Sequence, residues 1–330
     1  MVLSKKFVLA KHFVGKPSSD DIKLVTEELP DEVNDEEVLC EAVWLSVDPY
    51  MRINVGSLSE GDVMMGEQVA RVIASKNPKF PEGTHVMAHF GWKSHTLVKD
   101  VSVLRKVPDI EDLPLSLTLG SLGMPGLTAY FGFLEKSQPK SGETVLVNTA
   151  AGAVGSIVGQ IAKIKGCKVV AFAGTEEKCS WLKNELGFDQ VFNYKNIDLD
   201  KVLSSSVPDG IDCYFDNVGG HFSSVVLNHM NTQGRVCICG CLSEYNVPAE
   251  NTLKGPYPFK RILFKELSIF GFIVWKCMQR ADEGRKQLLE WIKSGKLIYK
   301  ETITEGFENM PKAFLGLFEG SNVGKAIVKA

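Results

Sequence analysis

The hydrophobic pattern from about residue 120 onward alternates between the period of a strand and that of a helix. Short β-branched runs indicate strands, and apolar residues recur at helical spacing between them. Strands are predicted at 144–149, 168–173, 190–193, 211–215, 234–240 and 267–275, and helices at 154–165, 176–186, 220–230 and 282–294. This alternation predicts a doubly wound α/β domain with a parallel sheet and right-handed crossovers.

The first 120 residues have a different pattern. They contain many valines, prolines and short strand-like runs separated by turns, which predicts a mostly β domain, either a barrel or a distorted sandwich. The last stretch, 299–330, returns to strand, helix and strand, and we expect it to rejoin the N-terminal domain. We therefore predict a β domain over 1–122, an α/β domain over 123–288, and a return to the first domain over 289–330.

Composition narrows the class of protein. The chain is 44% hydrophobic and 23% charged, as globular proteins are, and its net charge of −3 favours neither nucleic acid nor anionic membrane as a partner. Its N-terminus lacks the apolar run of a signal peptide, and no stretch is apolar over the length needed to span a bilayer. We expect a cytoplasmic protein.

The eight cysteines contain no C-x-x-C pair and often lie in apolar runs, which predicts reduced and mostly buried thiols. Cys237, Cys239 and Cys241 alternate. Period-2 spacing predicts that they share one face of a strand as packing residues, and not that they bind a metal.

The strand at 144–149 leads directly into a turn of small residues, Ala150-Ala151-Gly152-Ala153-Val154-Gly155. Small residues let a backbone approach phosphates closely, and the N–H groups of the following helix face the anion. The turn therefore predicts a dinucleotide pyrophosphate site. Ala150 stands where the G-x-G-x-x-G pattern has its first glycine, so the motif is incomplete.

The end of the second strand indicates which dinucleotide is used. NAD-preferring sheets have an acidic residue there that accepts a hydrogen bond from the ribose 2′-OH. In this chain the strand ends in Gly174-Thr175, and a cation, Lys178, follows. An open strand end followed by a cation fits a 2′-phosphate and favours NADPH. The alternative is that Lys178 is a solvated helix lysine.

Five segments together carry a resemblance to a known family. They are 47–52 (Val-Asp-Pro-Tyr-Met-Arg), 123–130, 150–155, 215–220 and 305–311. With them the chain resembles the zinc-free leukotriene B4 dehydrogenase branch of the medium-chain dehydrogenase/reductase superfamily, over nearly its whole length. The resemblance implies a GroES-like β-barrel domain built from both chain ends and a central Rossmann domain. It also implies a homodimer through edge strands of the Rossmann sheets, with 270–275 as the candidate edge.

The resemblance also implies an activity and a set of NADPH contacts. The activity is NADPH-dependent reduction of the carbon–carbon double bond of α,β-unsaturated aldehydes and ketones, including the 13,14-bond of 15-oxo-prostaglandins. Oxidation of the leukotriene B4 12-hydroxyl with NADP+ is a further expected reaction. The implied contacts are Gly152, Ala153, Val154, Gly155, Lys178, Tyr194, Asn217, Cys239, Gly240, Cys241, Leu242, Ser243, Glu244, Tyr245, Phe270, Gly271, Phe272 and Asn322.

No metal is expected. Zinc-dependent relatives carry Gly-His-Glu where this chain reads Gly66-Glu67-Gln68. His85, His89 and His95 are close in sequence, but a turn separates the last from the others, and we interpret all of them as surface or packing residues.

Hydrogen-bond donors must then polarise the substrate carbonyl. Tyr245, in the loop after the strand at 234–240, and Tyr50 are the candidate catalytic donors, together with the ribose hydroxyl of the cofactor. Arg52 is placed to bind a fatty-acid carboxylate or to serve as a structural ion-pair residue. Phe264 stands where the family has a tyrosine that contacts substrate. This difference weakens the inference that the family's lipid specificity applies to this chain.

Two other functions remain open. One is a zinc-free NADPH quinone oxidoreductase, and the other is a non-catalytic NADPH-binding protein. The segment 47–52 favours enal and enone reduction over quinone reduction. The presence of Tyr245, Asn217 and Lys178 argues against a protein without activity.

Overall fold

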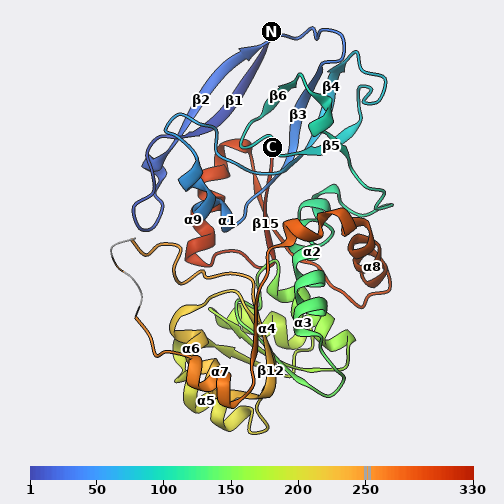
Figure 1. Cartoon of the computed structure of the whole chain (residues 1–330). Helices are drawn as coiled ribbons and strands as arrows, with labels where there is room; N and C mark the ends of the chain where they lie inside the picture. The colour runs from blue at the N-terminus through green and yellow to red at the C-terminus, as the bar shows by residue number, and fades with distance from the viewer. Residues whose placement is uncertain (249–250, 252–253) are drawn as a thin grey trace. The chain divides into compact units, whose positions relative to one another are not determined.

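The computed structural model describes residues 1–248, 251 and 254–330 (Figure 1). It divides into two compact units, the first formed by Met1–Gly120 with Glu301–Ala330 and the second by Ser121–Lys300. Helix α8 (Ala281–Lys293) lies whole within the second unit, although the boundary drawn from the sequence at residue 288 crosses it.

The first unit is mainly β. Strands β1 (Val2–Leu9) and β2 (Ile22–Leu29) pair antiparallel with each other, and a seven-stranded sheet has the order β14-β15-β3-β4-β5-β7, with β6 also paired to β3. The strands of this sheet are β3 (Val38–Ser46), β4 (Gln68–Ser75), β5 (His85–Ala88), β6 (His95–Val98), β7 (Arg105–Lys106), β14 (Glu301–Glu305) and β15 (Lys325–Lys329). Strand β15 pairs antiparallel with β3, so the C-terminal segment rejoins this unit as expected.

Two α-helices and an aromatic core complete the first unit. The helices are α1 (Tyr50–Asn54) and α9 (Met310–Glu319). Trp92 is fully buried and presents its ring edge-on to Phe7 and Phe314, with ring centroids 6.0 and 5.6 Å apart. Because Phe314 lies on α9, this packing fixes the C-terminal helix to the N-terminal strands.

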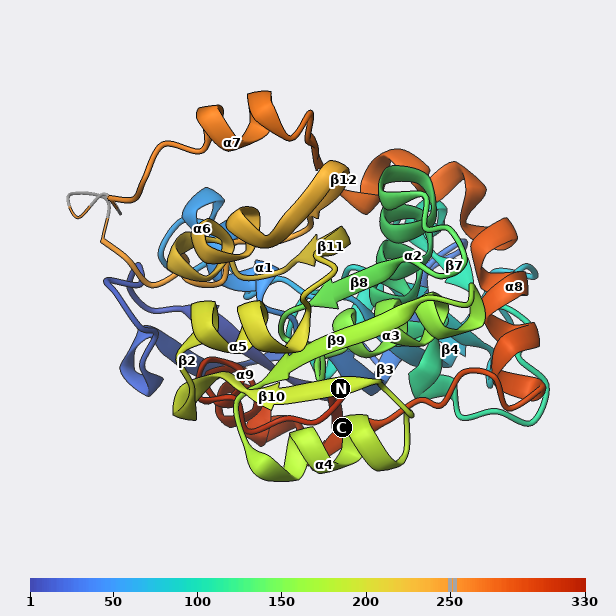
Figure 2. The same cartoon turned by 90° about the horizontal axis from the view of Figure 1, so that it is seen from below.

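The second unit contains a six-stranded parallel sheet of order β10-β9-β8-β11-β12-β13 (Figure 2). Its strands are β8 (Thr144–Val147), β9 (Lys168–Ala173), β10 (Gln190–Asn193), β11 (Ile211–Asp216), β12 (Met230–Ile238) and β13 (Ser268–Gly271). Its α-helices are α2 (Met124–Phe131), α3 (Gly155–Ile164), α4 (Glu176–Asn184), α5 (Leu199–Ser206), α6 (Gly220–His229), α7 (Phe259–Phe264) and α8. This is the Rossmann arrangement that the alternating pattern predicts.

Adjacent residues of β11 show how the two faces of this sheet are covered. Tyr214 belongs to a buried cluster with Leu203 of α5 and Val226 of α6. Its neighbour Phe215 lies 6.4 Å, centroid to centroid, from Phe133 of the π-helical segment that continues α2. Since successive side chains of a strand point to opposite faces, α5 and α6 cover one face and the α2 segment covers the other.

Two sequence predictions of local structure were wrong, and four α-helices were not predicted. The strand predicted over 267–275 ends at Gly271, and residues 274–280 form a 3-10 helix, because β12 ends at Ile238 and offers β13 no further pairing partner. Only Cys237 of the three alternating cysteines lies in β12, so the three do not share a strand face. The helices that were not predicted are α1, α2, α5 and α7. A signal for α5 was present, because Asp198 caps it by accepting a hydrogen bond from the Lys201 amide.

Candidate functional site

The candidate site lies at the carboxyl edge of the six-stranded sheet in the second unit. Because the strands are parallel, their carboxyl ends all meet at this edge. Predicted cofactor residues follow every strand, namely Tyr194 after β10, Lys178 after β9, 152–155 after β8, Asn217 after β11, 239–245 after β12, and 270–272 at the end of β13. The chain leaves β8 for β9 and β10 and then returns to β11 on the other side of β8, and this reversal is where doubly wound sheets bind ligands.

The small-residue turn after β8 has the close approach that a phosphate site requires. A Cβ added to Gly155 would lie 2.5 Å from the Thr149 carbonyl oxygen, so only glycine fits. Ala150 is fully buried and donates its amide to the Phe172 carbonyl at 3.0 Å, and Thr149 takes the left-handed conformation at φ 49°. The left-handed residue of this turn is therefore Thr149, which explains why alanine is accepted at position 150. No side chain caps the start of α3; instead the amides of Ser156 and Ile157 donate to the carbonyls of Gly152 and Val154, both at 3.1 Å.

A buried polar network joins the ends of β8 and β11 beneath this turn. The Asn148 side-chain amide donates to the Tyr214 hydroxyl at 2.7 Å and to the Asp216 carboxylate at 2.8 Å. Its Oδ1 accepts the Asn217 amide at 2.7 Å, and the Asn217 side chain donates to the Asn148 carbonyl at 3.0 Å. Ser223 of α6 donates to the second oxygen of Asp216. The predicted cofactor residue Asn217 is thus held by both its backbone and its side chain.

The loop 239–245 lies along the residues that follow β11. The amides of Cys239 and Gly240 donate to the Asp216 carbonyl at 2.8 and 3.1 Å, and the Ser243 amide donates to the Val218 carbonyl at 3.0 Å. A Cβ on Gly240 would lie 3.0 Å from the Asn217 carbonyl oxygen, so the two segments are in close contact. Burial raises the pKa of the Cys239 thiol to about 12, which keeps it protonated at neutral pH.

Tyr245 closes this loop and is half-buried. Burial, followed by the neighbouring Cys241, raises the pKa of its phenol above the ordinary value of 10.0. The phenol is therefore a neutral hydrogen-bond donor at physiological pH.

The end of β9 is open and positively charged. Thr175 caps α4 by accepting the Lys178 amide at 3.3 Å, which sets Lys178 in the first turn of the helix. A Cβ on Gly174 would lie 3.2 Å from the Tyr194 ring, so this ring lies directly beside the strand end. Burial, and secondarily the charge of Lys195, lowers the pKa of Lys178.

Two predicted sites involve β13 and α7. Phe272 is buried, donates its amide to the Ile238 carbonyl at 2.9 Å and packs against Gly132, whereas Phe270 is exposed at the edge of the sheet. Phe264, the predicted substrate contact, lies on α7 with 73% of its surface exposed.

Three predicted site residues belong to the first unit. Tyr50 begins α1, and burial, with Asp48 and Glu67 adding to it, raises its pKa. Arg52 donates to the Gly15 carbonyl at 2.8 Å and lies over the Phe13 ring at 5.4 Å. These contacts support a structural role for Arg52.

The remaining first-unit residue, Asn322, donates to the Gly324 carbonyl at 2.8 Å, just before β15. On β15 itself, the buried Lys325 ammonium binds the Asp48 carboxylate at 3.0 Å and the Val47 carbonyl at 2.7 Å. This ion pair anchors the segment that carries Tyr50 and Arg52.

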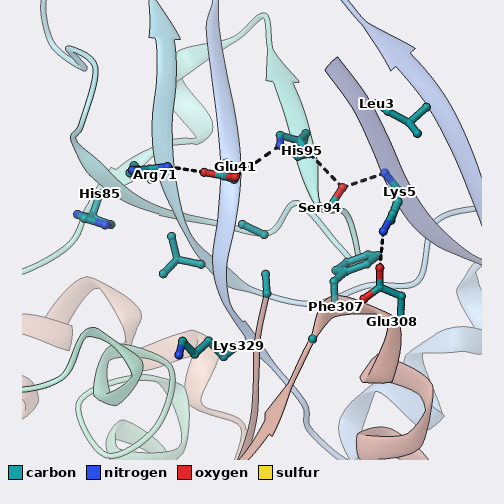
Figure 3. Close-up of a pocket in the computed structure, with 14 residues that line it drawn as sticks. Leu3, Lys5, Glu41, Arg71, His85, Ser94, His95, Phe307, Glu308 and Lys329 are labelled. Carbon is teal, nitrogen blue, oxygen red and sulfur yellow. Dashed lines mark hydrogen bonds and ion pairs between the residues drawn. The ribbon is translucent and has the colours of Figure 1, made fainter. Parts of the chain in front are cut away.

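A separate pocket of about 530 Å³ lies within the first unit (Figure 3). Four of its charged side chains form two ion pairs, Lys5 with Glu308 and Arg71 with Glu41, and Lys329 pairs with Glu305 outside the lining. His95 extends the second pair, because its Nε2 lies 3.8 Å from Glu41. Burial lowers the pKa of His95, so the imidazole is largely neutral at pH 7. None of the predicted site residues lines this pocket, so it is distinct from the candidate site.

Two features of the described residues bear on the function. No three His, Cys, Asp or Glu side chains there are grouped closely enough to hold a metal ion. None of the helices in the described parts of the chain has the length and apolarity needed to cross a membrane.

Comparison with known proteins identifies the family. Residues 5–107 match the family described as the N-terminal domain of oxidoreductase, and residues 153–294 match the family described as zinc-binding dehydrogenase. The chain is 55% identical to prostaglandin reductase 1 of Bos taurus and 54% identical to that of Rattus norvegicus, with all of this chain and all of each relative covered. The chain belongs to the prostaglandin reductase 1 family. It is an oxidoreductase of the medium-chain dehydrogenase/reductase superfamily.

Relatives of this family extend to plants and bacteria. The chain is 40% identical to 2-alkenal reductase (NADP(+)-dependent) of Nicotiana tabacum, with 99% of this chain and 97% of the relative covered. The crystal structure of CurA in complex with NADPH from Vibrio vulnificus superposes with a TM-score of 0.91 at 38% identity, covering 99% of both chains. An Escherichia coli quinone oxidoreductase, at 18% identity and a TM-score of 0.77, shares the fold alone.

Sequence reasoning missed several residues that shape this site. Asn148 and Asp216 stand at the carboxyl ends of apolar strands. A polar residue that directly follows a buried apolar strand was the signal that could have found them. Tyr214 and Ser223 carried no such signal. The pairing of β11 with β8 brings Tyr214 to Asn148, and the position of α6 brings Ser223 to Tyr214.

Proposed function

We propose that this protein reduces the carbon–carbon double bond of α,β-unsaturated aldehydes and ketones with NADPH, and that 15-oxo-prostaglandins are among its substrates. The full-length identity to prostaglandin reductase 1, at 55%, carries the proposal. The 40% identity to a plant 2-alkenal reductase supports the wider substrate class.

The residues at the sheet edge fit NADPH. The turn after β8, in which Gly155 packs directly on Thr149, is our candidate pyrophosphate site, and the end of β9 at Gly174, with Lys178 beside it, suits a 2′-phosphate. Asn217, fixed by Asn148, is our candidate for binding the nicotinamide ribose. When bound, NADPH supplies a hydride to the β-carbon of the substrate.

Tyr245 is our first candidate for stabilising the charge that the reaction creates. Addition of hydride to the β-carbon moves negative charge onto the carbonyl oxygen as an enolate. A phenol that donates to this oxygen stabilises the transition state more than the ground state. The raised pKa of Tyr245 keeps its proton in place for this role. Tyr50, also with a raised pKa, is the second candidate donor, and water supplies the α-carbon proton in the simplest scheme.

We further propose a cytoplasmic homodimer that needs no metal. Strand β13 is an edge strand, and Ile273 and Trp275 just beyond it are 66% and 46% exposed. An exposed apolar edge of this kind favours pairing with a second copy.

The test follows NADPH absorbance with 4-hydroxynonenal, with 15-oxo-prostaglandin E, and with a quinone. We expect oxidation with the first two. Oxidation with the quinone alone would instead establish a quinone oxidoreductase, and no oxidation with any substrate would indicate a binding protein. Tyr245→Phe should lower kcat for the enal by about 10²-fold or more, as loss of an oxyanion donor does. Full turnover in this variant would remove Tyr245 from the mechanism.

A further inference from the structure

A second lysine reaches the open end of β9. The 3-10 turn Tyr194–Asn196 follows β10 and places two side chains beside Gly174. A Cβ added to Gly174 would lie 3.4 Å from Cε of Lys195, the carbon that carries the ammonium group, and 3.2 Å from the Tyr194 ring. Both side chains therefore border the strand end at which Lys178 enters α4.

The 3-10 turn is held against α4 by Glu176, the first residue of that helix. The Asn193 side chain donates to Glu176 Oε1 at 2.7 Å, and the Asn196 side chain donates to the same oxygen at 3.4 Å. The Lys195 amide in turn donates to Asn193 Oδ1 at 3.2 Å. These contacts fix the backbone of Lys195 relative to the helix that carries Lys178.

The two lysines are close enough to influence each other. After burial, the Lys195 charge is the largest influence that lowers the pKa of Lys178. In the part of the chain that the structure describes, no carboxylate pairs with the Lys195 ammonium. A phosphate monoester near neutral pH carries about −1.5 to −2 charges, more than one lysine neutralises. A dianion beside both ammonium groups would turn their repulsion into attraction.

We propose that Lys195 is a second specificity-determining residue for the 2′-phosphate of NADPH, sharing this charge with Lys178. The inference rests on the proposed NADPH dependence, in which Lys178 is the first such residue. Tyr194 and Gly174 then form the neutral walls of the same subsite.

The test is equilibrium binding without substrate, measured by fluorescence titration of NADPH, NADH and 2′,5′-ADP. Lys195→Gln should raise the Kd of NADPH and of 2′,5′-ADP about 5- to 10-fold, because one charge-assisted contact is lost. The Kd of NADH should change less than about twofold, since it has no 2′-phosphate. Affinity for NADPH should also depend less on ionic strength in this variant.

Two variants serve as controls. Lys195→Arg keeps the charge and should bind NADPH within about threefold of the unmodified protein. Lys201→Gln removes a lysine of the following helix, α5, that is 84% exposed and pairs with Asp198, and it should change none of the affinities.

The outcomes separate this inference from the proposed function. Equal loss of NADPH and NADH affinity in Lys195→Gln would overturn the inference. An unchanged NADPH affinity in Lys195→Gln, with a loss in Lys178→Gln, would also overturn it and leave the proposed function standing. A protein that binds NADPH no better than NADH would overturn both.

Discussion

Removal of the Asn148 side chain should both destabilise the second unit and weaken cofactor binding. This side chain is 1% exposed and makes three hydrogen bonds, to Tyr214, Asp216 and the Asn217 amide. Two of the bonds join neutral groups, at about 1 kcal/mol each, and the bond to the carboxylate contributes about 1.5–3 kcal/mol. Asn148→Ala should therefore lower the free energy of unfolding by about 4 kcal/mol.

Urea unfolding measures this loss. With a slope of about 2.5 kcal/mol/M, a loss of about 4 kcal/mol lowers the midpoint by about 1.6 M. Titration with NADPH should also show weaker binding, because Asn217 is no longer fixed. The control is Asn184→Ala, since Asn184 is exposed and donates only to Ser180, and its midpoint should shift by less than about 0.2 M. If the two variants shift alike, the buried network does not stabilise the fold and the reasoning fails.

Three further predictions concern the sheet edge. Gly155→Ala should fold but lose NADPH affinity by about tenfold or more, because its Cβ would meet the Thr149 carbonyl at 2.5 Å and displace the turn. Unchanged affinity in a calorimetric titration would contradict this prediction. Gly174→Asp should invert the ratio of NADPH to NADH affinity, because a carboxylate repels a 2′-phosphate and accepts a hydrogen bond from a 2′-OH. If the variant still preferred NADPH, the end of β9 would not be what selects the cofactor. The pKa of Tyr245 is raised, so its phenol stays protonated as the pH rises towards 10. We therefore expect kcat for an enal to stay constant between pH 7 and 9. A fall in kcat with a midpoint near pH 8 would show that another group controls the rate.

Local patterns predicted the second unit well and its long-range contacts poorly. Strands β9 and β10 have the predicted bounds, because β-branched runs with clear turn residues at both ends define them within the local sequence. The predicted strand 267–275 was too long because the apolar run continues past Gly271, whereas the length of β13 depends on where β12 ends.

The candidate site likewise has features that the local sequence displays and features that depend on long-range contacts. The turn 150–155 and Lys178 were predicted because their chemistry is visible in a few consecutive residues. The Asn148–Asp216 contact spans 68 positions, and the approach of Lys195 to Gly174 depends on how β10 pairs with β9. Such contacts follow from strand register, which a single sequence does not display.

The left-handed conformation of Thr149 has a consequence for the energetics of ligand binding. A β-branched residue at φ 49° is strained by about 1–3 kcal/mol, and such strain persists only where the surrounding structure imposes it. Here the imposing contacts, the Asn148 network on one side and the Ala150–Phe172 hydrogen bond on the other, form when the chain folds. The turn is therefore preorganised, and a ligand that binds against it does not have to order this backbone. Thr149→Gly would move part of that ordering cost from folding to binding, giving a backbone under less strain and weaker binding of the cofactor.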